Sequence, residues 1–267
     1  MRSLPHSVTG QPLAELLQQE DKDMKTFIAV DLETTGLSPE EDYIIEIGAL
    51  KYQEGKCKGT FSRLVKPPVS ISRRITEITG IDNNMVKDAP SIEIVMKEFL
   101  DFVGEEKVLL GHNLRFDYSF LKVHAKRLGY DFLMEGLDTL RIARKFLTNL
   151  PKKNLGALCE YYEVINPCAH RAYEDAKTTA VIYAKLHNDF AKDNPEAFQP
   201  QEMKYKEKKK EPMTEKQKKY LIDLVKYHKI QDEVFLGNME GFLDAMTKSE
   251  ASKKIDEIIL HYGKMIR

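Results

Sequence analysis

Two carboxylates stand one residue apart at the end of a short apolar run. Asp31 and Glu33 belong to V-D-L-E-T-T-G, residues 30–36, which follows T-F-I-A. On a β-strand, residues i and i+2 point to the same face, so these side chains converge if the strand continues through both. Converging carboxylates repel each other and lose hydration, which favours a cation between them, and oxygen ligands suit Mg²⁺ or Mn²⁺. Taken alone, the pair is equally consistent with a solvated strand end.

Two further stretches place candidate ligands near the ends of expected elements. G-H-N-L-R-F-D, residues 111–117, puts Asp117 after a buried strand and at the start of a helix, where it also suits a simple N-cap. H-R-A-Y-E-D-A, residues 170–176, contains His170 and Asp175. In one helix these two would lie roughly 140° apart around the axis. A shared site therefore requires His170 on the preceding loop and Asp175 in the opening turns; by itself, His170 is also explained by a structural role.

Together, the four carboxylates and the histidine predict a two-metal site. Two divalent ions held about 4 Å apart can activate a water and stabilise the leaving oxygen of an in-line displacement at phosphorus. A histidine, with an ordinary pKa of about 6.5, is suited to accept that water's proton near neutral pH. The phosphate-binding loops G-x-G-x-x-G and G-x-x-x-x-G-K-[ST] are absent from the sequence.

The order of these motifs resembles a known family. D-L-E-T-T-G, I-T-E-I-T-G-I, G-H-N-L-R-F-D and H-x-x-x-x-D are similar to the successive motifs of the DEDDh 3′-to-5′ exonucleases, the family of the epsilon proofreading subunit of bacterial DNA polymerase III. The resemblance runs from Thr26 to about Asp189. The histidine variant is indicated, because the tyrosine variant would have Tyr where this chain has Arg171.

The resemblance implies roles for individual residues. Two Mg²⁺ or Mn²⁺ ions would be held by Asp31, Glu33, Asp117 and Asp175, and His170 would be the general base. The 3′-terminal nucleotide would be bound by Thr34, Thr35, Leu37, Thr79, Gly80, Asn113 and Phe116. Phe116 offers an aromatic surface for a base or sugar. The epsilon subunit has His at the position of Thr79, so this turn resembles the Gram-positive polymerase exonucleases.

The elements that would position these residues follow from the pattern of apolar residues. T-F-I-A-V-D, D-Y-I-I-E-I-G-A-L-K-Y and G-T-F-S-R-L-V predict a three-stranded meander with Gly-containing turns between the strands. Beyond it, a buried strand at K-V-L-L-G-H-N alternates with segments of helical spacing, one of them closed by Gly129. This order predicts an α/β fold with a mixed sheet. The resemblance implies a ribonuclease H-like five-stranded sheet flanked by helices, followed by a small C-terminal helical module.

Composition shifts predict four segments. They are an N-terminal extension (1–24), a globular block (25–192) that the resemblance identifies as a DEDDh exonuclease domain, a Lys-rich linker (193–212) and a small helical C-terminal domain (213–267). The last contains a weak repeat, M-T-E-K-Q-K-K at Met213 and M-T-K-S-E-A-S at Met246, each with Thr followed three residues later by Gln or Glu, as in a capping box. Such a helical module could dock to another protein, bind nucleic acid through the net positive charge from Lys204 onward, or pack on the exonuclease domain, and packing explains it at least as well as the other two roles.

Composition limits the class of protein. The chain has 267 residues, of which 42% are hydrophobic and 31% charged, and no apolar run has the length that a bilayer requires. Without a secretory signal at the N-terminus we expect a cytoplasmic protein, and the three cysteines predict no disulfide framework. Net charge is −1, but residues 204–267 hold 15 basic and 11 acidic residues. A nucleic-acid partner would thus be held locally or through metal ions.

The leading hypothesis is a 3′-to-5′ exonuclease of the proofreading or repair type, which releases 5′-monophosphates from single-stranded or frayed DNA. An exoribonuclease that trims RNA is the alternative enzyme, because the metal site does not distinguish a 2′-OH. A non-catalytic protein that binds nucleic acid or docks on a polymerase is a third hypothesis. The expected partners are a nucleic-acid 3′ end, with DNA favoured over RNA, and a DNA polymerase or replication protein bound through the C-terminal module, with no membrane.

Overall fold

The computed structural model describes residues 26–53, 56–206, 211–230 and 239–265. The chain divides into two compact units, Met1–Lys206 and Glu207–Arg267, which are described separately. The extension predicted for residues 1–24 lies outside the described residues. Within the described residues, no helix has the length and apolar character needed to cross a membrane.

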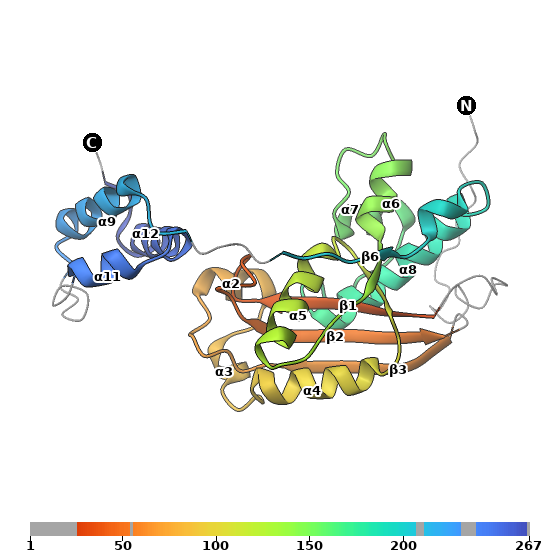
Figure 1. Ribbon diagram of the computed structural model, residues 1–267. Coiled ribbons are helices and arrows are strands. Elements are labelled where there is room, and N and C mark those ends of the chain that lie inside the picture. The colour runs from red at the N-terminus through yellow and green to blue at the C-terminus, as the bar shows by residue number, and fades with distance from the viewer. Residues whose placement is uncertain (1–25, 54–55, 207–210, 231–238, 266–267) are drawn as a thin grey trace. The chain divides into compact units, whose positions relative to one another are not determined.

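The first unit is built on a mixed sheet (Figure 1). Over the described residues the sheet has six strands in the order β3-β2-β1-β4-β5-β6, so the predicted α/β fold with a mixed sheet is confirmed and a short sixth strand is added at its edge. The strands are β1 (Phe27–Thr34), β2 (Ile44–Gln53), β3 (Lys56–Leu64), β4 (Val108–Gly111), β5 (Glu135–Asp138) and β6 (Gln201–Glu202).

The central strand β1 sets the geometry of the sheet. It pairs antiparallel with β2, which pairs antiparallel with β3, and this confirms the predicted meander. On its other side β1 is parallel to β4, which is parallel to β5. The carboxyl ends of β1, β4 and β5 therefore meet at one edge of the sheet, where α/β proteins commonly form their sites.

Helices cover both faces of this sheet because the buried side chains of β1 alternate. Phe27 and Ala29 pack with α6, α7 and α8, whereas Ile28 and Val30 pack with α4 and α5. The long helix α8 crosses β1 and β2 (Figure 1). The bounds of these helices are α4 (Ile92–Val103), α5 (Arg115–Arg127), α6 (Thr139–Phe146), α7 (Leu155–Tyr162) and α8 (Ala172–Phe190).

Two short helices, α2 (Arg73–Thr79) and α3 (Asn83–Val86), follow β3. Ser72 caps α2 by accepting a hydrogen bond from the Ile75 backbone N–H. The helix ends at Gly80, which has a φ of 71°, a left-handed conformation that glycine adopts without a Cβ penalty. The I-T-G-I turn of the sequence is thus a helix C-terminus.

The residues that follow α8 belong to the first unit. The 3-10 helix η1 (Pro195–Phe198) buries Phe198 in the same core as α8, and β6 pairs antiparallel with β5. Beyond β6, the Tyr205 hydroxyl donates a hydrogen bond to the Glu40 carboxylate. The segment 193–212, predicted as a Lys-rich linker, therefore begins with residues that complete the sheet.

The second unit contains α9 (Glu215–Tyr227), α11 (Met239–Ala245) and α12 (Lys248–Tyr262) among its described residues. Both predicted capping boxes are confirmed, at Thr214 with Gln217 and at Thr247 with Glu250. The residues that precede α9 and α12 pair with each other, since the Met213 N–H donates to the Met246 carbonyl. The sequence repeat therefore corresponds to two helices that start side by side. A third helix, α11, lies between them in the sequence.

Gly48 in β2 tests how closely α8 must approach the sheet. A Cβ added at Gly48 would overlap the backbone of Ala172 and Tyr173 at the start of α8. We expect Gly48→Ala to lower the free energy of unfolding by at least about 1–3 kcal/mol, because overpacking against backbone cannot be relieved by a rotamer change. Urea denaturation of the two proteins measures this difference.

The matched control is Gly156→Ala, because Gly156 lies in α7 and an added Cβ there meets no atom within 4 Å. Removing a helical glycine should leave stability unchanged or raise it by about 0.5–1 kcal/mol. Equal effects of the two substitutions would contradict a close approach of α8 to β2.

Candidate active site

The end of β1 carries the two carboxylates on one face. The strand continues to Thr34, so Asp31 and Glu33 point to the same side, as the prediction required. Asp31 is partly buried and Glu33 is only 9% exposed. By the alternation of the strand, both lie on the face covered by α8. The site is therefore enclosed by the sheet and this helix rather than open to solvent at a frayed strand end.

Asp117 reaches the same place from the helix on the opposite face. It lies in the first turn of α5, is 3% exposed, and its Oδ1 accepts a hydrogen bond from the Leu32 backbone N–H at 3.1 Å. The N-cap position of α5 is occupied by Leu114, without a side-chain cap. The alternative of simple N-capping by Asp117 is thus not what the structure has; the carboxylate binds the backbone of β1 between Asp31 and Glu33.

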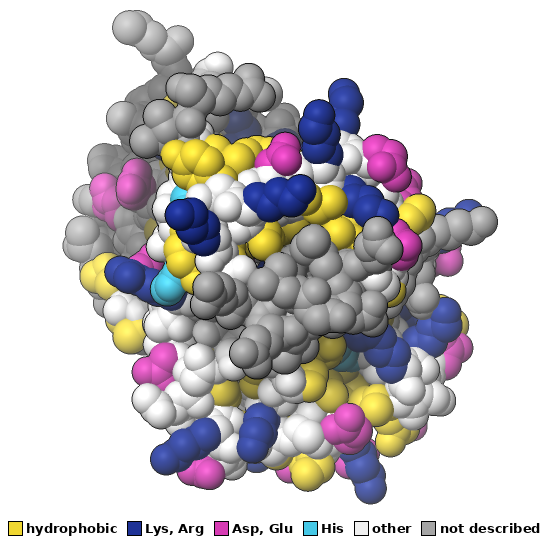
Figure 2. Space-filling model, turned by 90° about the vertical axis from the view of Figure 1, so that its left-hand side faces the viewer, with side chains coloured by type: hydrophobic (Ala, Val, Ile, Leu, Met, Phe, Trp, Pro, Cys, Tyr) yellow, Lys and Arg dark blue, Asp and Glu magenta, His cyan; other side chains and the backbone are white. Residues whose placement is uncertain are grey.

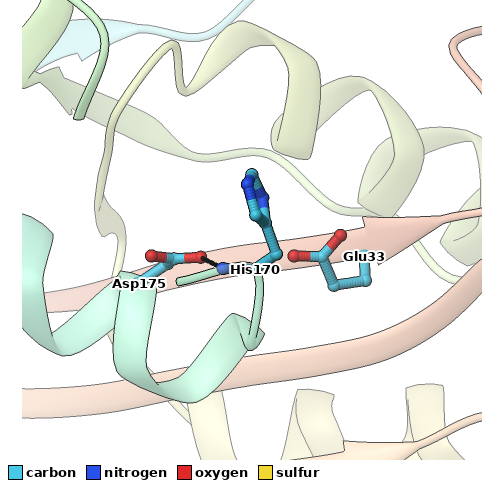
Figure 3. Close-up of side chains that lie close together, drawn as sticks. All are labelled: Glu33, His170 and Asp175. Carbon is cyan, nitrogen blue, oxygen red and sulfur yellow. Dashed lines mark hydrogen bonds between the residues drawn. The ribbon is translucent and has the colours of Figure 1, made fainter. Parts of the chain in front are cut away.

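His170 lies on the loop before α8, and Asp175 lies in the first turns of that helix, as a shared site requires. The two oxygens of Asp175 accept hydrogen bonds from the Asn166 side chain at 2.6 Å and from the His170 backbone N–H at 2.8 Å. Ligand atoms of Glu33, His170 and Asp175 all lie within 4.8 Å of one another. Figure 3 shows the Glu33 carboxylate facing the His170–Asp175 pair.

The surroundings of the four carboxyl groups at this site disfavour their ionisation. Burial, with Asp117, Asp175 and Glu33 nearby, raises the pKa of Asp31 well above its ordinary value. Burial, followed by repulsion from Asp175 and Glu46, raises the pKa of Glu33 to about 8. Burial also raises the pKa values of Asp117 and Asp175, although hydrogen bonds to both carboxylates work in the opposite direction. The protein holds like charges together at a cost that a bound cation would offset.

The donors fit divalent metal ions, because carboxylate oxygens of Glu33 and Asp175 and a ring nitrogen of His170 lie close enough to share one ion. Four carboxylates converge, and burial together with their mutual repulsion keeps the pKa values of Asp31 and Glu33 raised even though Arg171 lowers that of Glu33. Oxygen-rich ligand sets suit Mg²⁺ and Mn²⁺ rather than the Cys and His sets of structural zinc sites. The identity of the metal stays a prediction.

Three of the predicted nucleotide contacts lie at the last residue of β1 and on the turn that follows it. The Thr34 hydroxyl donates to the Gly36 carbonyl at 2.6 Å, and the Thr35 hydroxyl accepts from the Tyr43 N–H at 3.0 Å. The buried Asp42 carboxylate accepts from the Ser38 N–H at 2.9 Å and so braces the turn. Leu37 is 85% exposed. Leu37 is thus accessible to a ligand, whereas the two threonine hydroxyls shape the turn.

The other four predicted contacts differ in accessibility. Thr79 is 4% exposed, and its hydroxyl bonds the Ile75 carbonyl and the Ile81 N–H, so it stabilises the end of α2. Gly80 and Asn113 are exposed and Phe116 is half-buried. Asn113 has a φ of 63°, and its N–H donates to Asp138. A nucleotide role for these residues stays a prediction, and for Thr79 the structure supplies only a structural one.

Sequence reasoning missed several polar residues around the site. Glu46 is 1% exposed and pairs with Arg171, Asn166 bonds Asp175, and Asp138 accepts hydrogen bonds from Asn113 and Leu140. A signal existed for Glu46, since it is a single acid inside the apolar run I-I-E-I. No comparable pattern marks Asn166.

Comparison with known families agrees with this arrangement. A family model described as Exonuclease (RNase_T) matches residues 28–183, which include all five predicted catalytic residues. The chain belongs to this exonuclease family. Its resemblance to DEDDh exonucleases is therefore confirmed, and an exonuclease domain is what the first unit contains.

Curated relatives include proteins named as a DNA polymerase III or as a subunit of one. The chain is 48% identical over 179 residues to the DNA polymerase III PolC-type of Caldanaerobacter subterraneus, a match that covers 67% of this chain and 12% of that protein. It is 37% identical over 162 residues to the DNA polymerase III subunit epsilon of Aquifex aeolicus, covering 60% of this chain and 80% of the relative. The chain thus spans only about an eighth of the PolC-type relatives.

Solved structures share the fold. Exonuclease X in complex with 5′ overhanging duplex DNA is 27% identical, with a TM-score of 0.51, and the match covers 62% of this chain and 93% of that one. The nuclease domain of 3′hExo, described as a DEDDh family member bound to rAMP, has a TM-score of 0.56 at 19% identity and covers 67% of this chain and 98% of that one. These likenesses confirm the ribonuclease H-like α/β fold.

The raised pKa of Glu33 makes the stability of the metal-free protein depend on pH. The pKa is about 8 in the folded protein and 4.5 ordinarily, so stabilisation is fully present below pH 4.5 and is lost as pH rises through 8. We expect Glu33→Gln, which cannot ionise, to remove this loss. The difference in Tm between variant and wild type, measured in EDTA, should grow in favour of the variant from about pH 5 to about pH 9.

Glu98→Gln is the control, because Glu98 forms an exposed ion pair with Arg63 on the surface. Its Tm should follow the wild-type pH profile. Adding Mn²⁺ should raise the wild-type Tm most at alkaline pH, where the carboxylates are ionised. A Tm difference for Glu33→Gln that stays constant with pH would contradict the raised pKa.

Proposed function

We propose that the first unit is a metal-dependent 3′-to-5′ exonuclease of the proofreading or repair type. The observation that carries the proposal is the convergence of Asp31, Glu33, Asp117 and Asp175 with His170 at one edge of the sheet. Its substrate is the 3′ end of single-stranded or frayed DNA. The products are a nucleoside 5′-monophosphate and a strand shorter by one nucleotide.

The four carboxylates would hold two divalent ions, and His170 would act as the general base. When bound, such ions stabilise negative charge on the attacking and leaving oxygens of an in-line displacement. His170 accepts a proton from water as the water oxygen bonds to the terminal phosphorus. The bond from phosphorus to the 3′ oxygen of the preceding nucleotide breaks, and that oxygen takes up a proton from solvent. The exposed position of His170 suits this role, because its ring is accessible to a substrate.

The terminal nucleotide is proposed to lie against Leu37, Asn113, Phe116 and Gly80. Leu37 and Asn113 are exposed, and the Phe116 ring is half-buried against Phe120 at a centroid distance of 5.0 Å. Aromatic and apolar surfaces of this kind accept bases without sequence preference. The hydroxyls of Thr34, Thr35 and Thr79 contribute indirectly, through hydrogen bonds that stabilise the turns near these contact residues.

DNA is favoured over RNA because the curated relatives are named as a DNA polymerase III PolC-type and a DNA polymerase III epsilon subunit. RNA trimming remains the second candidate, since 3′hExo is described in complex with rAMP. A non-catalytic role is disfavoured because all four carboxylates and His170 are present in the chain. Loss of catalysis would ordinarily leave a ligand missing.

Polarity and sugar preference are tested together with single-stranded DNA and RNA of one sequence, each labelled at the 3′ or the 5′ end, with Mg²⁺ and with Mn²⁺. We expect the 3′ label to be released at once as a mononucleotide, whereas the 5′ label should persist on a ladder of shortening products, and DNA should be degraded faster. Immediate release of the 5′ label would refute the direction. Faster cleavage of RNA would favour the exoribonuclease.

His170→Ala should reduce turnover by at least about 100-fold, since general-base catalysis contributes roughly 10²–10⁴-fold. Metal-dependent binding of DNA, measured by fluorescence anisotropy, should stay close to wild type. Asp31→Ala should weaken metal binding as well as turnover, because it removes a ligand. Near-normal turnover of His170→Ala would refute the assignment of the general base.

For the second unit we infer docking to a DNA polymerase or replication protein. On the face of the molecule drawn in Figure 2, lysine and arginine side chains are interspersed with acidic and hydrophobic ones. Within the second unit, Lys218 pairs with Asp244 and Lys248 pairs with Glu211, so basic side chains there have acidic neighbours. Tyr227, Leu260 and Tyr262 of this unit are each about half exposed or more. Exposed aromatic residues are enriched in protein interfaces, whereas surfaces that bind nucleic-acid phosphates are strongly basic.

Removing residues 207–267 should therefore leave the salt dependence of DNA binding unchanged. If the module bound phosphates of a single strand, log Kd would vary less steeply with log salt after removal, by about 0.7 for each phosphate that the module had neutralised. Binding of the full and shortened chains is compared over a range of salt concentrations. A flatter slope for the shortened chain would reject protein docking in favour of nucleic-acid binding.

A further inference from the structure

The backbone of His170 adopts a conformation that contacts with other residues must stabilise. His170 has a φ of 65°, in the left-handed region, which costs a non-glycine residue roughly 1–2 kcal/mol. Its side chain is exposed, so no packing of the ring fixes the backbone. Residues in such conformations persist only when neighbouring contacts define them. The contacts on both sides of His170 therefore decide where its ring lies.

On the C-terminal side of His170, the loop contacts the buried carboxylate of Glu46 in β2. Glu46 is 1% exposed and stands opposite Glu33 in the register of β1 and β2. Arg171, the residue after His170, reaches it from 125 positions away in the sequence. The Arg171 Nη2 lies 2.7 Å from Glu46 Oε1, and its Nε lies 3.2 Å from Oε2. This two-point geometry is the one in which arginine holds a carboxylate in a fixed orientation.

The same carboxylate also accepts a hydrogen bond from the N-terminus of α8. The Ala172 backbone N–H donates to Glu46 Oε2 at 3.1 Å, and Arg171 at the N-cap position makes no side-chain cap hydrogen bond. A carboxylate from β2 therefore occupies the place of a cap at the positive end of the helix dipole. Gly48, two residues further along β2, permits this approach because it has no Cβ.

We propose that Glu46 and Arg171 are positioning residues for His170. Their ion pair fixes the backbone of residues 171 and 172, while Asp175 fixes the His170 N–H, so the imidazole is held between two anchored points. Neither residue is assigned a contact with the reacting atoms. The inference rests on the proposed role of His170 as general base and adds what orients that base.

A competing role for Arg171 is direct contact with the substrate. Its side chain is 42% exposed, so its guanidinium is open to solvent on one side. A phosphate contact would strengthen substrate binding, and its removal would raise KM. A positioning role predicts a fall in kcat with KM unchanged, because the substrate binds equally well to a site whose base is misplaced.

The experiment uses the full chain with Mn²⁺ and a 3′-labelled DNA oligonucleotide. Arg171→Lys keeps the charge but loses the two-point geometry, and Glu46→Gln keeps the shape but loses the charge. Each should lower kcat by about 10- to 100-fold, since a displacement of about 1 Å can cost about 100-fold. KM should stay at the wild-type value in both variants, and in Arg171→Lys, which keeps the charge, the rise of Tm on adding Mn²⁺ should also be that of the wild type.

Two comparisons distinguish a positioning role of the ion pair from a non-specific structural effect of the substitutions. The double variant should lose little more than either single variant, because both remove one interaction. In a His170→Ala background, Arg171→Lys should have no further effect on the residual rate. The matched control is the surface pair of Arg63 and Glu98, whose Nε–Oε2 distance is 2.9 Å, and in which Arg63→Lys and Glu98→Gln should leave kcat unchanged.

The outcomes that overturn the inference are distinct from failure of the proposed function. A raised KM with unchanged kcat in Arg171→Lys would assign Arg171 to substrate binding. Wild-type kcat in either single variant, or additive losses in the double variant, would also reject positioning through this pair. If the wild-type protein released no nucleotides, or if His170→Ala were fully active, the proposed function itself would fail.

Discussion

The repulsion among buried carboxylates at the end of β1 is the constraint on which the rest of the structure depends. Asp31 and Glu33 share one face of the strand, Asp117 approaches from α5, and Asp175 approaches from α8. Left to themselves, four such groups would move apart or take up protons. The sheet and the helices on its two faces prevent the first, which leaves either protonation or a bound cation.

The fold supplies this restraint mainly with backbone hydrogen bonds. Asp117 is held by the Leu32 N–H and Asp175 by the His170 N–H, while Glu46 receives the Ala172 N–H. Backbone donors carry no net charge, so they orient the carboxylates without neutralising them. Two side chains add to these backbone donors: the Asn166 amide donates to Asp175, and Arg171 is directed to Glu46 rather than to the proposed metal ligands.

Much of the first unit could be predicted because its signals are local. The meander of β1 to β3 follows from three β-rich runs separated by turns, and the D-x-E pair shares a face because the strand period is two. Strands β5 and β6 have four and two residues, and β5 contains Gly136, so only long-range pairing defines them. The same reason hid the pair of Glu46 and Arg171. Thr79 was assigned to the substrate by its position in a motif, whereas its burial depends on how α2 ends.

Strand β6 has a consequence for how the sheet is protected. It covers the outer edge of β5, and Met203 packs so closely on Gly136 that a Cβ there would meet its sulfur. A fragment that stopped at residue 192, the predicted end of the exonuclease domain, would leave that edge with unpaired N–H and C=O groups and would uncover the core around Phe198. Open edges of this kind recruit other strands, so such a fragment would tend to self-associate. The segment after α8 thus closes the edge of the sheet as well as leading to the second unit.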